Sequence, residues 1–256
     1  MRRKFKEALL SPAVWLTLLA GGVALLNVAE NYKGRTGSTD VFTYLDYARN
    51  LWNGMGFVGR IHLSFDLWAR GFDPIPMESN RLLHPLALLL GRLLSGDWLL
   101  GAAFVTCLLY MMTVPAVYWL GTLWFGRPAA VLGTLFFIVN RYTVAYMLHG
   151  ISDPLFLFLL LLSVAVLLRS ERFWSDLPAG GLMGLAALVR PGGLAYALVL
   201  LIIPMLRPAP WRERVLSVAG VVFPVLLASQ TGWLLNVLVF GRGDLYGVVK
   251  TSPFLT

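Results

Sequence analysis

The chain has little of the charge that keeps soluble proteins in water. Only 13% of its 256 residues are charged, against roughly 25% in a typical soluble domain. Cys107 is the single cysteine, which excludes a disulfide or a multi-cysteine metal site within the chain. Apolar sequence is abundant instead, with 58% hydrophobic residues and a mean hydropathy of +0.72. This composition predicts an all-α membrane protein with one membrane domain over residues 1–256.

Apolar runs near the roughly 20 residues that a helix needs to cross a bilayer recur along the chain. They predict about seven membrane-spanning helices, and the fifth is expected to begin at Pro178. The predicted spans are residues 13–29, 98–125, 129–147, 154–168, 178–190, 192–206 and 215–240. Residues 85–94 are apolar but too short to cross, which favours a helix that lies in the interface or dips back into the membrane. The first run has no clear small-residue cleavage site, so we expect a retained anchor.

Basic residues fall in alternate connections between the predicted spans and so predict an orientation. One side receives the N-terminus and the arginines Arg127, Arg169, Arg172, Arg207, Arg212 and Arg214. The positive-inside rule makes this side cytoplasmic in a plasma or inner membrane. The net charge of +8 then predicts contact with anionic membrane lipids and no nucleic-acid partner, because the basic residues are scattered between spans. A large loop, residues 30–97, and a polar tail, residues 241–256, lie on the extracytoplasmic side.

Three ionisable residues far apart in sequence fall at extracytoplasmic helix ends in this arrangement. They are Asp40, Asp153 and Arg190. Ionisable groups at membrane depth are costly and are functional candidates. The alternative is that each one caps a helix in the headgroup region.

The loop segment 38–57 reads as a capped helix. Ser38 or Thr39 can accept bonds from the first-turn amides, and glycines follow at 54 and 56. Asp40 and Tyr44 share one stripe of this helix, whereas Asp46 lies about 240° around the axis from Asp40. Asp40 is therefore the better candidate for a pocket, and a simple capping role is its alternative.

Four motifs in order resemble those of the GT-C glycosyltransferases, a superfamily that includes protein O-mannosyltransferases and lipid A aminoarabinose transferases. The first is the pattern D-x-x-x-Y-x-x-x-A-x-x-L-x-x-G-x-G-F that begins at Asp40. The others are Arg81-Leu-Leu-His84-Pro85, Gly150-Ile-Ser-Asp153-Pro154 and Gly181-Leu-Met-Gly184-Leu-Ala-Ala-Leu-Val-Arg190-Pro191. Together they cover nearly the whole chain and are similar to the seven-helix module of that superfamily.

The resemblance implies transfer of a sugar from a polyprenyl-phosphate donor to a lipid, glycan or protein acceptor on the extracytoplasmic face. Asp40 would be the catalytic base, and Asp153 would position the acceptor or, with Asp40, hold Mg²⁺ or Mn²⁺. Arg190 would pair with the lipid phosphate. Tyr44, Arg81, His84 and His149 would be further substrate contacts, although an interfacial histidine such as His149 is commonly a capping or lipid-facing group.

The sequence departs from the family pattern in three places. Val41 follows Asp40 where the best-known members carry an acidic pair, which weakens a two-carboxylate metal site in the loop. His84-Pro85 replaces the usual Pro-Pro motif. Most members have further helices, so a truncated product, a gene fragment or a module that needs a partner chain is expected.

Two other functions fit the spans. A non-enzymatic transporter or flippase would use the prolines inside the spans, because interrupted helices are common in transporters. An accessory subunit would use Gly180, Gly181 and Gly184 as close-packing points between helices.

Overall fold

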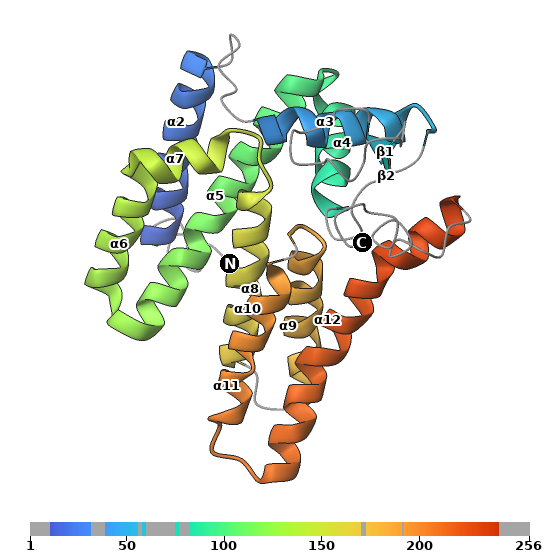
Figure 1. Cartoon of the computed structure of the whole chain (residues 1–256). Helices are drawn as coiled ribbons and strands as arrows, with labels where there is room; N and C mark the ends of the chain where they lie inside the picture. Colours follow the sequence, from blue (N-terminus) through green and yellow to red (C-terminus); the bar gives the residue numbers. More distant parts are fainter. Residues whose placement is uncertain are drawn as a thin grey trace, which may run out of the picture.

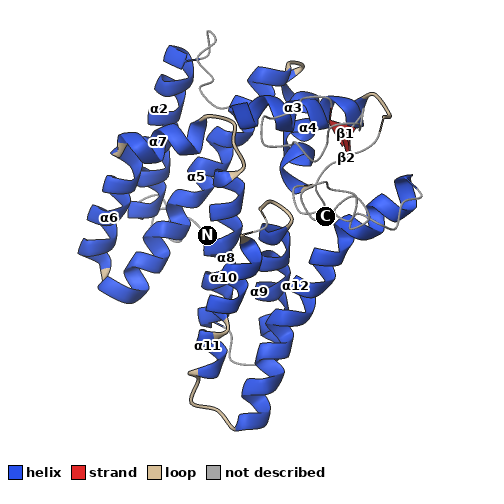
Figure 2. Cartoon of the chain, in the orientation of Figure 1, coloured by secondary structure: helices blue, strands red, loops and turns tan. Residues whose placement is uncertain are grey.

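The structure is a computed structural model that describes residues 11–31, 39–55, 58–59, 75–76, 82–169, 173–190 and 192–240. Figure 2 shows that these residues are helical apart from loops and one short strand pairing. In that pairing β1 (Val58–Gly59) runs antiparallel to β2 (Ile75–Pro76), with Val58 opposite Pro76. The all-α expectation is therefore confirmed for the described part of the chain.

Three helices are long and apolar enough to cross a membrane: α2 (Pro12–Asn31), α5 (Trp98–Phe125) and α12 (Trp211–Phe240). The boundaries of α5 match the predicted 98–125. Its first amides, from Leu99 and Leu100, donate to the Asp97 side chain at 2.9 and 2.8 Å. Large apolar side chains on these helices stay exposed, such as Phe125 at 73%. Several apolar helices of this length indicate a membrane protein.

The predicted third crossing, 129–147, is wrong as a continuous helix. It divides into α6 (Arg127–Val139) and α7 (Arg141–Leu148), which meet at 63°. Asn140 causes the break, because its side-chain oxygen accepts a hydrogen bond from the amide of Tyr142 at 3.0 Å. The carbonyl of Ile138 would otherwise accept that amide, and it accepts the Tyr110 hydroxyl at 2.8 Å instead. Counting this pair as one span gives four candidate crossings among the described residues.

Of the remaining predicted crossings, the fourth lies within one residue of its predicted bounds, the fifth begins earlier, and the sixth is divided in two. They are α8 (Asp153–Arg169), α9 (Phe173–Ala187), α10 (Gly193–Leu200) and α11 (Ile202–Met205). Pro178 lies inside α9 and does not begin it, and α12 begins at Trp211, before the predicted position 215. The predicted sixth helix divides near Leu201, because Pro204 has no amide to donate to the carbonyl of Leu200.

Buried side chains form separate clusters within the helical bundle, which Figure 1 shows as a whole. Leu159, Met183 and Val221 join α8, α9 and α12. A second cluster around Tyr110 and Ile138 joins α2, α5, α6 and α7. At α9, a Cβ on Gly180 would lie 2.6 Å from the Gly220 carbonyl of α12, so this glycine allows close packing inside the chain.

The helices α3 (Thr39–Trp52) and α4 (Leu83–Ser95) lie across the end of the bundle at which α8 begins (Figure 1). Within the segment predicted as a capped loop helix, 38–57, the structure is helical over Thr39–Trp52 and turns at residues 53–54. A helix is likewise present at the predicted residues 85–94, as α4, and its place at the membrane interface stays a prediction. Val41 and Tyr44 of α3 pack with Leu88 of α4 and with Ile151, which precedes α8. This third cluster packs around the turn that precedes α8, where the candidate functional site lies.

Candidate functional site

The site is built around the turn 149–152, which connects α7 to α8. Gly150 has φ +75°, a conformation that side chains with a Cβ rarely adopt. A Cβ there would lie 3.3 Å from a methyl group of Val41. The turn therefore needs glycine both for its backbone shape and for the close approach of α3.

Two buried side chains hold this turn. The Nε2 of His84 lies 3.0 Å from the carbonyl oxygen of Gly150, and the Tyr44 hydroxyl lies 3.1 Å from the Ser152 hydroxyl. Because a carbonyl only accepts, Nε2 carries the proton that it donates. The two rings also meet edge to face with centroids 4.8 Å apart. One residue from α3 and one from α4 thus hold the turn immediately before Asp153, through the Ser152 side chain and the Gly150 backbone.

His84 is neutral in this setting. It is fully buried in a helix too short to cross a membrane, and burial lowers its pKa from 6.5 to about 4. Its Nδ1 is also buried and has no hydrogen-bond partner among the described residues. Both His84 and Tyr44, which is 4% exposed, were predicted to contact substrate. In this conformation both side chains contact the turn, and their predicted contacts with substrate stay predictions.

Asp153 and Arg190 form an ion pair, in which Arg190 Nη1 donates to Asp153 Oδ1. Asp153 lies in the first turn of α8, where the helix dipole favours a carboxylate. Arg190 follows α9, and its amide bonds the carbonyl of Ala186 at 3.1 Å. The side chains stay 35% and 43% exposed, so the pair remains accessible to a ligand. Two of the three residues predicted to converge are therefore in contact.

A backbone bond connects α4 to the end of α9 and completes the site. The amide of Leu83 donates to the carbonyl of Leu188 at 3.2 Å, two residues before Arg190. The start of α4 therefore lies beside the segment that carries Arg190, while His84 bonds the turn that precedes Asp153. We name this region, Tyr44, His84, residues 149–153 and Arg190, the Asp153 end of the bundle.

Asp40, His149 and Arg81 were also predicted to belong to the site. Asp40 is exposed in the first turn of α3, one residue before Val41, which contacts Gly150. His149 is half-buried and follows the last residue of α7 as its C-cap. Arg81 lies outside the described residues. The roles predicted for these residues stay predictions.

A second ion pair at the opposite end of α8 and α9 was missed by the sequence analysis. Arg207 donates to both carboxylate oxygens of Asp176, at 2.8 and 2.9 Å, and to the carbonyl of Leu167 at 2.7 Å. Asp176 is completely buried, and Arg207 is 15% exposed. The signal for this pair was an aspartate in the first turn of a glycine-rich apolar helix. We name this region the Asp176 end.

The sequence also predicted that Asp40 and Asp153 hold a divalent cation, and this stays a prediction. No group of three or more histidine, cysteine, aspartate or glutamate side chains that could hold a metal ion occurs within the described ranges. The carboxylate of Asp153 is also bonded by a guanidinium, which competes with a cation for the same oxygen.

Compared with known proteins, the chain matches no family model, no curated protein and no solved structure.

Proposed function

We propose that this chain is a GT-C-type glycosyltransferase that moves a sugar from a polyprenyl-phosphate donor to an acceptor at the Asp153 end. The observation that carries the proposal is the accessible ion pair of Asp153 and Arg190 beside the turn on which α3 docks. A fixed but solvent-accessible guanidinium is suited to a phosphate ester, because its planar N–H groups match phosphate oxygens. The ordered motifs around Asp40, Asp153 and Arg190 favour this chemistry further.

In the proposed reaction an acceptor hydroxyl oxygen attacks C1 of the sugar. The new C1–O bond forms as the bond from C1 to the phosphate oxygen breaks, and the electron pair leaves with the polyprenyl phosphate. Asp40 accepts the proton of the acceptor as general base. Arg190 stabilises the charge on the departing phosphate, and Asp153 holds the guanidinium in place.

The proposed topology keeps seven crossings. Helix α8 has 17 residues, about 25 Å at 1.5 Å per residue, which is close to the lower limit for a span. Helix α9 and the pair α10 with α11 would be the fifth and sixth crossings. The N-terminus and the Asp176 end, which carries Arg169 and Arg207, would then be cytoplasmic, and the Asp153 end extracytoplasmic.

Matched aspartate variants test the proposed base. The full chain is reconstituted in liposomes with labelled polyprenyl-phosphate sugars and a bacterial lipid extract as acceptor source. Asp40→Asn should lower transfer by about 10²- to 10⁴-fold, the usual contribution of a general base. Asp46→Asn is the control, because Asp46 lies on the same helix α3 in a different direction. Equal transfer by the two variants would remove Asp40 from the mechanism.

A transporter or flippase is the second candidate, and one observation favours it. The 63° break between α6 and α7 is a discontinuity of the kind that transporters use. The same liposomes distinguish the candidates. A flippase would move the labelled donor between leaflets without releasing polyprenyl phosphate, whereas a transferase releases it.

A further inference from the structure

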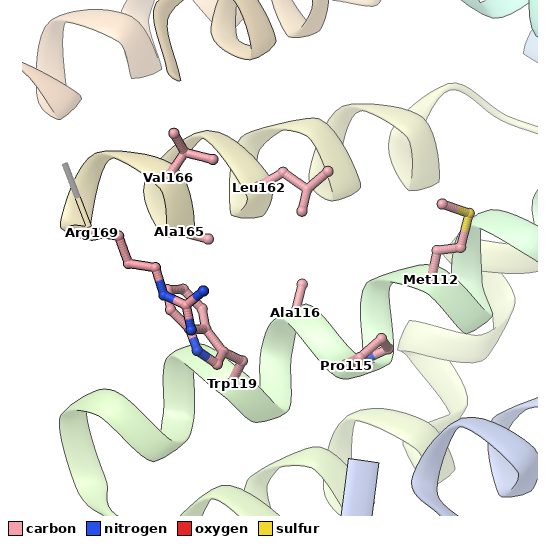
Figure 3. Close-up of a pocket in the computed structure, with 8 residues that line it drawn as sticks. All are labelled: Met112, Pro115, Ala116, Trp119, Leu162, Ala165, Val166 and Arg169. Carbon is pink, nitrogen blue, oxygen red and sulfur yellow. The ribbon is translucent and has the colours of Figure 1, made fainter. Parts of the chain in front are cut away.

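A hollow of about 350 Å³ lies between α5 and α8, toward the Asp176 end of the bundle. Four residues of α5 and four of α8 line it, and all but Arg169 are apolar or aromatic (Figure 3). Its volume falls at the lower end of the roughly 300–1,000 Å³ typical of small-ligand sites. An apolar hollow with one cation at its edge is suited to an amphiphile with an anionic head.

Arg169 closes one end of the hollow. Its guanidinium carbon lies 4.3 Å from the centre of the Trp119 ring, and Figure 3 shows the two groups stacked. Stacking occupies the face of the guanidinium and leaves its N–H edge free to bond oxygen atoms in the same plane. Arg169 is exposed in the last turn of α8, so this edge can reach a lipid headgroup.

Two alanines and a proline form the floor of the hollow. Ala116 and Ala165 face it from α5 and α8, and Pro115 lies inside α5 beside Ala116 (Figure 3). Larger side chains at the two alanines would fill the space between the helices. The floor is therefore shaped for a hydrocarbon chain that lies along both helices.

We propose that this hollow binds one anionic glycerophospholipid, with an acyl chain between α5 and α8 and its phosphate on Arg169. Charge complementarity selects the occupant, because the single charged side chain of the lining is a cation and the chain carries a net charge of +8. The site is distinct from the proposed donor site, since Asp153 begins α8 and Arg169 ends it. It therefore does not depend on the proposed glycosyltransferase activity.

Lipid titration of the purified full chain in detergent, followed by native mass spectrometry, tests the site. Wild type should bind one dioleoyl phosphatidylglycerol more tightly than dioleoyl phosphatidylcholine. Arg169→Gln should weaken phosphatidylglycerol binding about fivefold, which corresponds to about 1 kcal/mol for one basic residue near anionic lipid. Arg127→Gln is the control, because Arg127 is exposed at the start of α6 and does not line the hollow.

A second variant tests the hydrocarbon part independently. Ala165→Phe fills the hollow without changing charge and should weaken binding of both lipids by more than Arg169→Gln weakens phosphatidylglycerol. The proposal is overturned if Arg169→Gln binds phosphatidylglycerol like Arg127→Gln, or if Ala165→Phe binds like wild type. Competition by inorganic phosphate alone would also overturn it, because the ligand would then be a free anion.

Discussion

The two ends of the α8–α9 pair each carry an aspartate–arginine ion pair, and the two pairs differ in access to solvent. At the Asp176 end the guanidinium bonds both carboxylate oxygens and a backbone carbonyl, and the aspartate is completely buried. At the Asp153 end the pair has one recorded contact and leaves more than a third of each side chain exposed.

This difference separates a structural pair from a pair that can act on a ligand. The N–H groups of Arg207 donate hydrogen bonds to partners within the bundle, so few of them can bond a ligand. Arg190 is held at one position and keeps further N–H groups accessible. The bundle is therefore expected to depend on the Asp176 end for stability and on the Asp153 end for activity.

The largest expected effect is on stability at the Asp176 end. Arg207→Ala should lower the free energy of unfolding by about 3–5 kcal/mol, because it leaves the Asp176 carboxylate buried without a partner. Thermal unfolding in detergent, followed by tryptophan fluorescence, measures the change. Arg212→Ala, at an exposed position of α12, is the control and should shift stability by no more than about 0.5 kcal/mol. Equal unfolding midpoints for the two variants would contradict a structural role for the buried pair.

The matching change at the Asp153 end should affect activity. Arg190→Ala should reduce donor turnover about 10²- to 10³-fold, because it removes the group that we propose to stabilise the leaving phosphate. Its stability should change by less than about 1 kcal/mol, since exposed ion pairs contribute little. Release of polyprenyl phosphate and the unfolding midpoint are measured on the same sample. A large stability loss with unchanged turnover would reverse the roles that we assign to the two ends.

Acid should destabilise the Asp153 end through His84. Its pKa is about 4 in the folded chain and 6.5 in the unfolded chain, so the unfolded state binds more protons between these values. Stability is present in full above pH 6.5 and falls as the pH drops toward 4, by about 3 kcal/mol from this group. Unfolding midpoints from pH 7.5 to 4 measure the slope. His84→Gln should flatten this slope. A slope that is flattened in His149→Gln and unchanged in His84→Gln would contradict the role of His84.

The smallest effects compare two neighbouring glycines of α9, the helix that joins both ends. Gly180→Ala should destabilise by about 1–3 kcal/mol, because its Cβ would lie 2.6 Å from backbone oxygens of α12. Gly181→Ala meets no atom within 4 Å and should be neutral or stabilising by up to about 1 kcal/mol. Unfolding midpoints of the two variants in detergent test this difference. Destabilisation of similar size in both would mean that α9 does not pack on α12 as described.

The sequence predicted elements best where capping residues and apolar length agree. Helix α5 is an example, since Asp97 and Gly126 bound a long apolar run on both sides. The break at Asn140 was missed because the apolar residues on both sides of Asn140 and Arg141 were read as one run of spanning length, and its physical cause is local. Asparagine accepts amides of the following turn, and the distant hydroxyl of Tyr110 satisfies the freed carbonyl. That tertiary contact is absent from any pattern along the chain.

The candidate site was predicted in part for a similar reason. Alternation of the spans placed Asp153 and Arg190 at one end, and the structure brings them into contact. The buried positions of Tyr44 and His84 depend on how α3 and α4 dock, which helical spacing does not determine. The Asp176 pair was missed because Arg207 was used only to predict the orientation of the spans. Nothing in the sequence indicated that its side chain turns back into the bundle to contact Asp176.

A polyprenyl phosphate that carries a photoreactive group at its phosphate end tests the central claim most directly. Reconstituted full chain is irradiated, digested and mapped by mass spectrometry, in wild type and in Arg190→Ala. The account predicts labels on residues 149–153 and around Arg190, with strong loss in the variant. Labels that gather at Trp119 and Arg169, or that persist unchanged in Arg190→Ala, would contradict it.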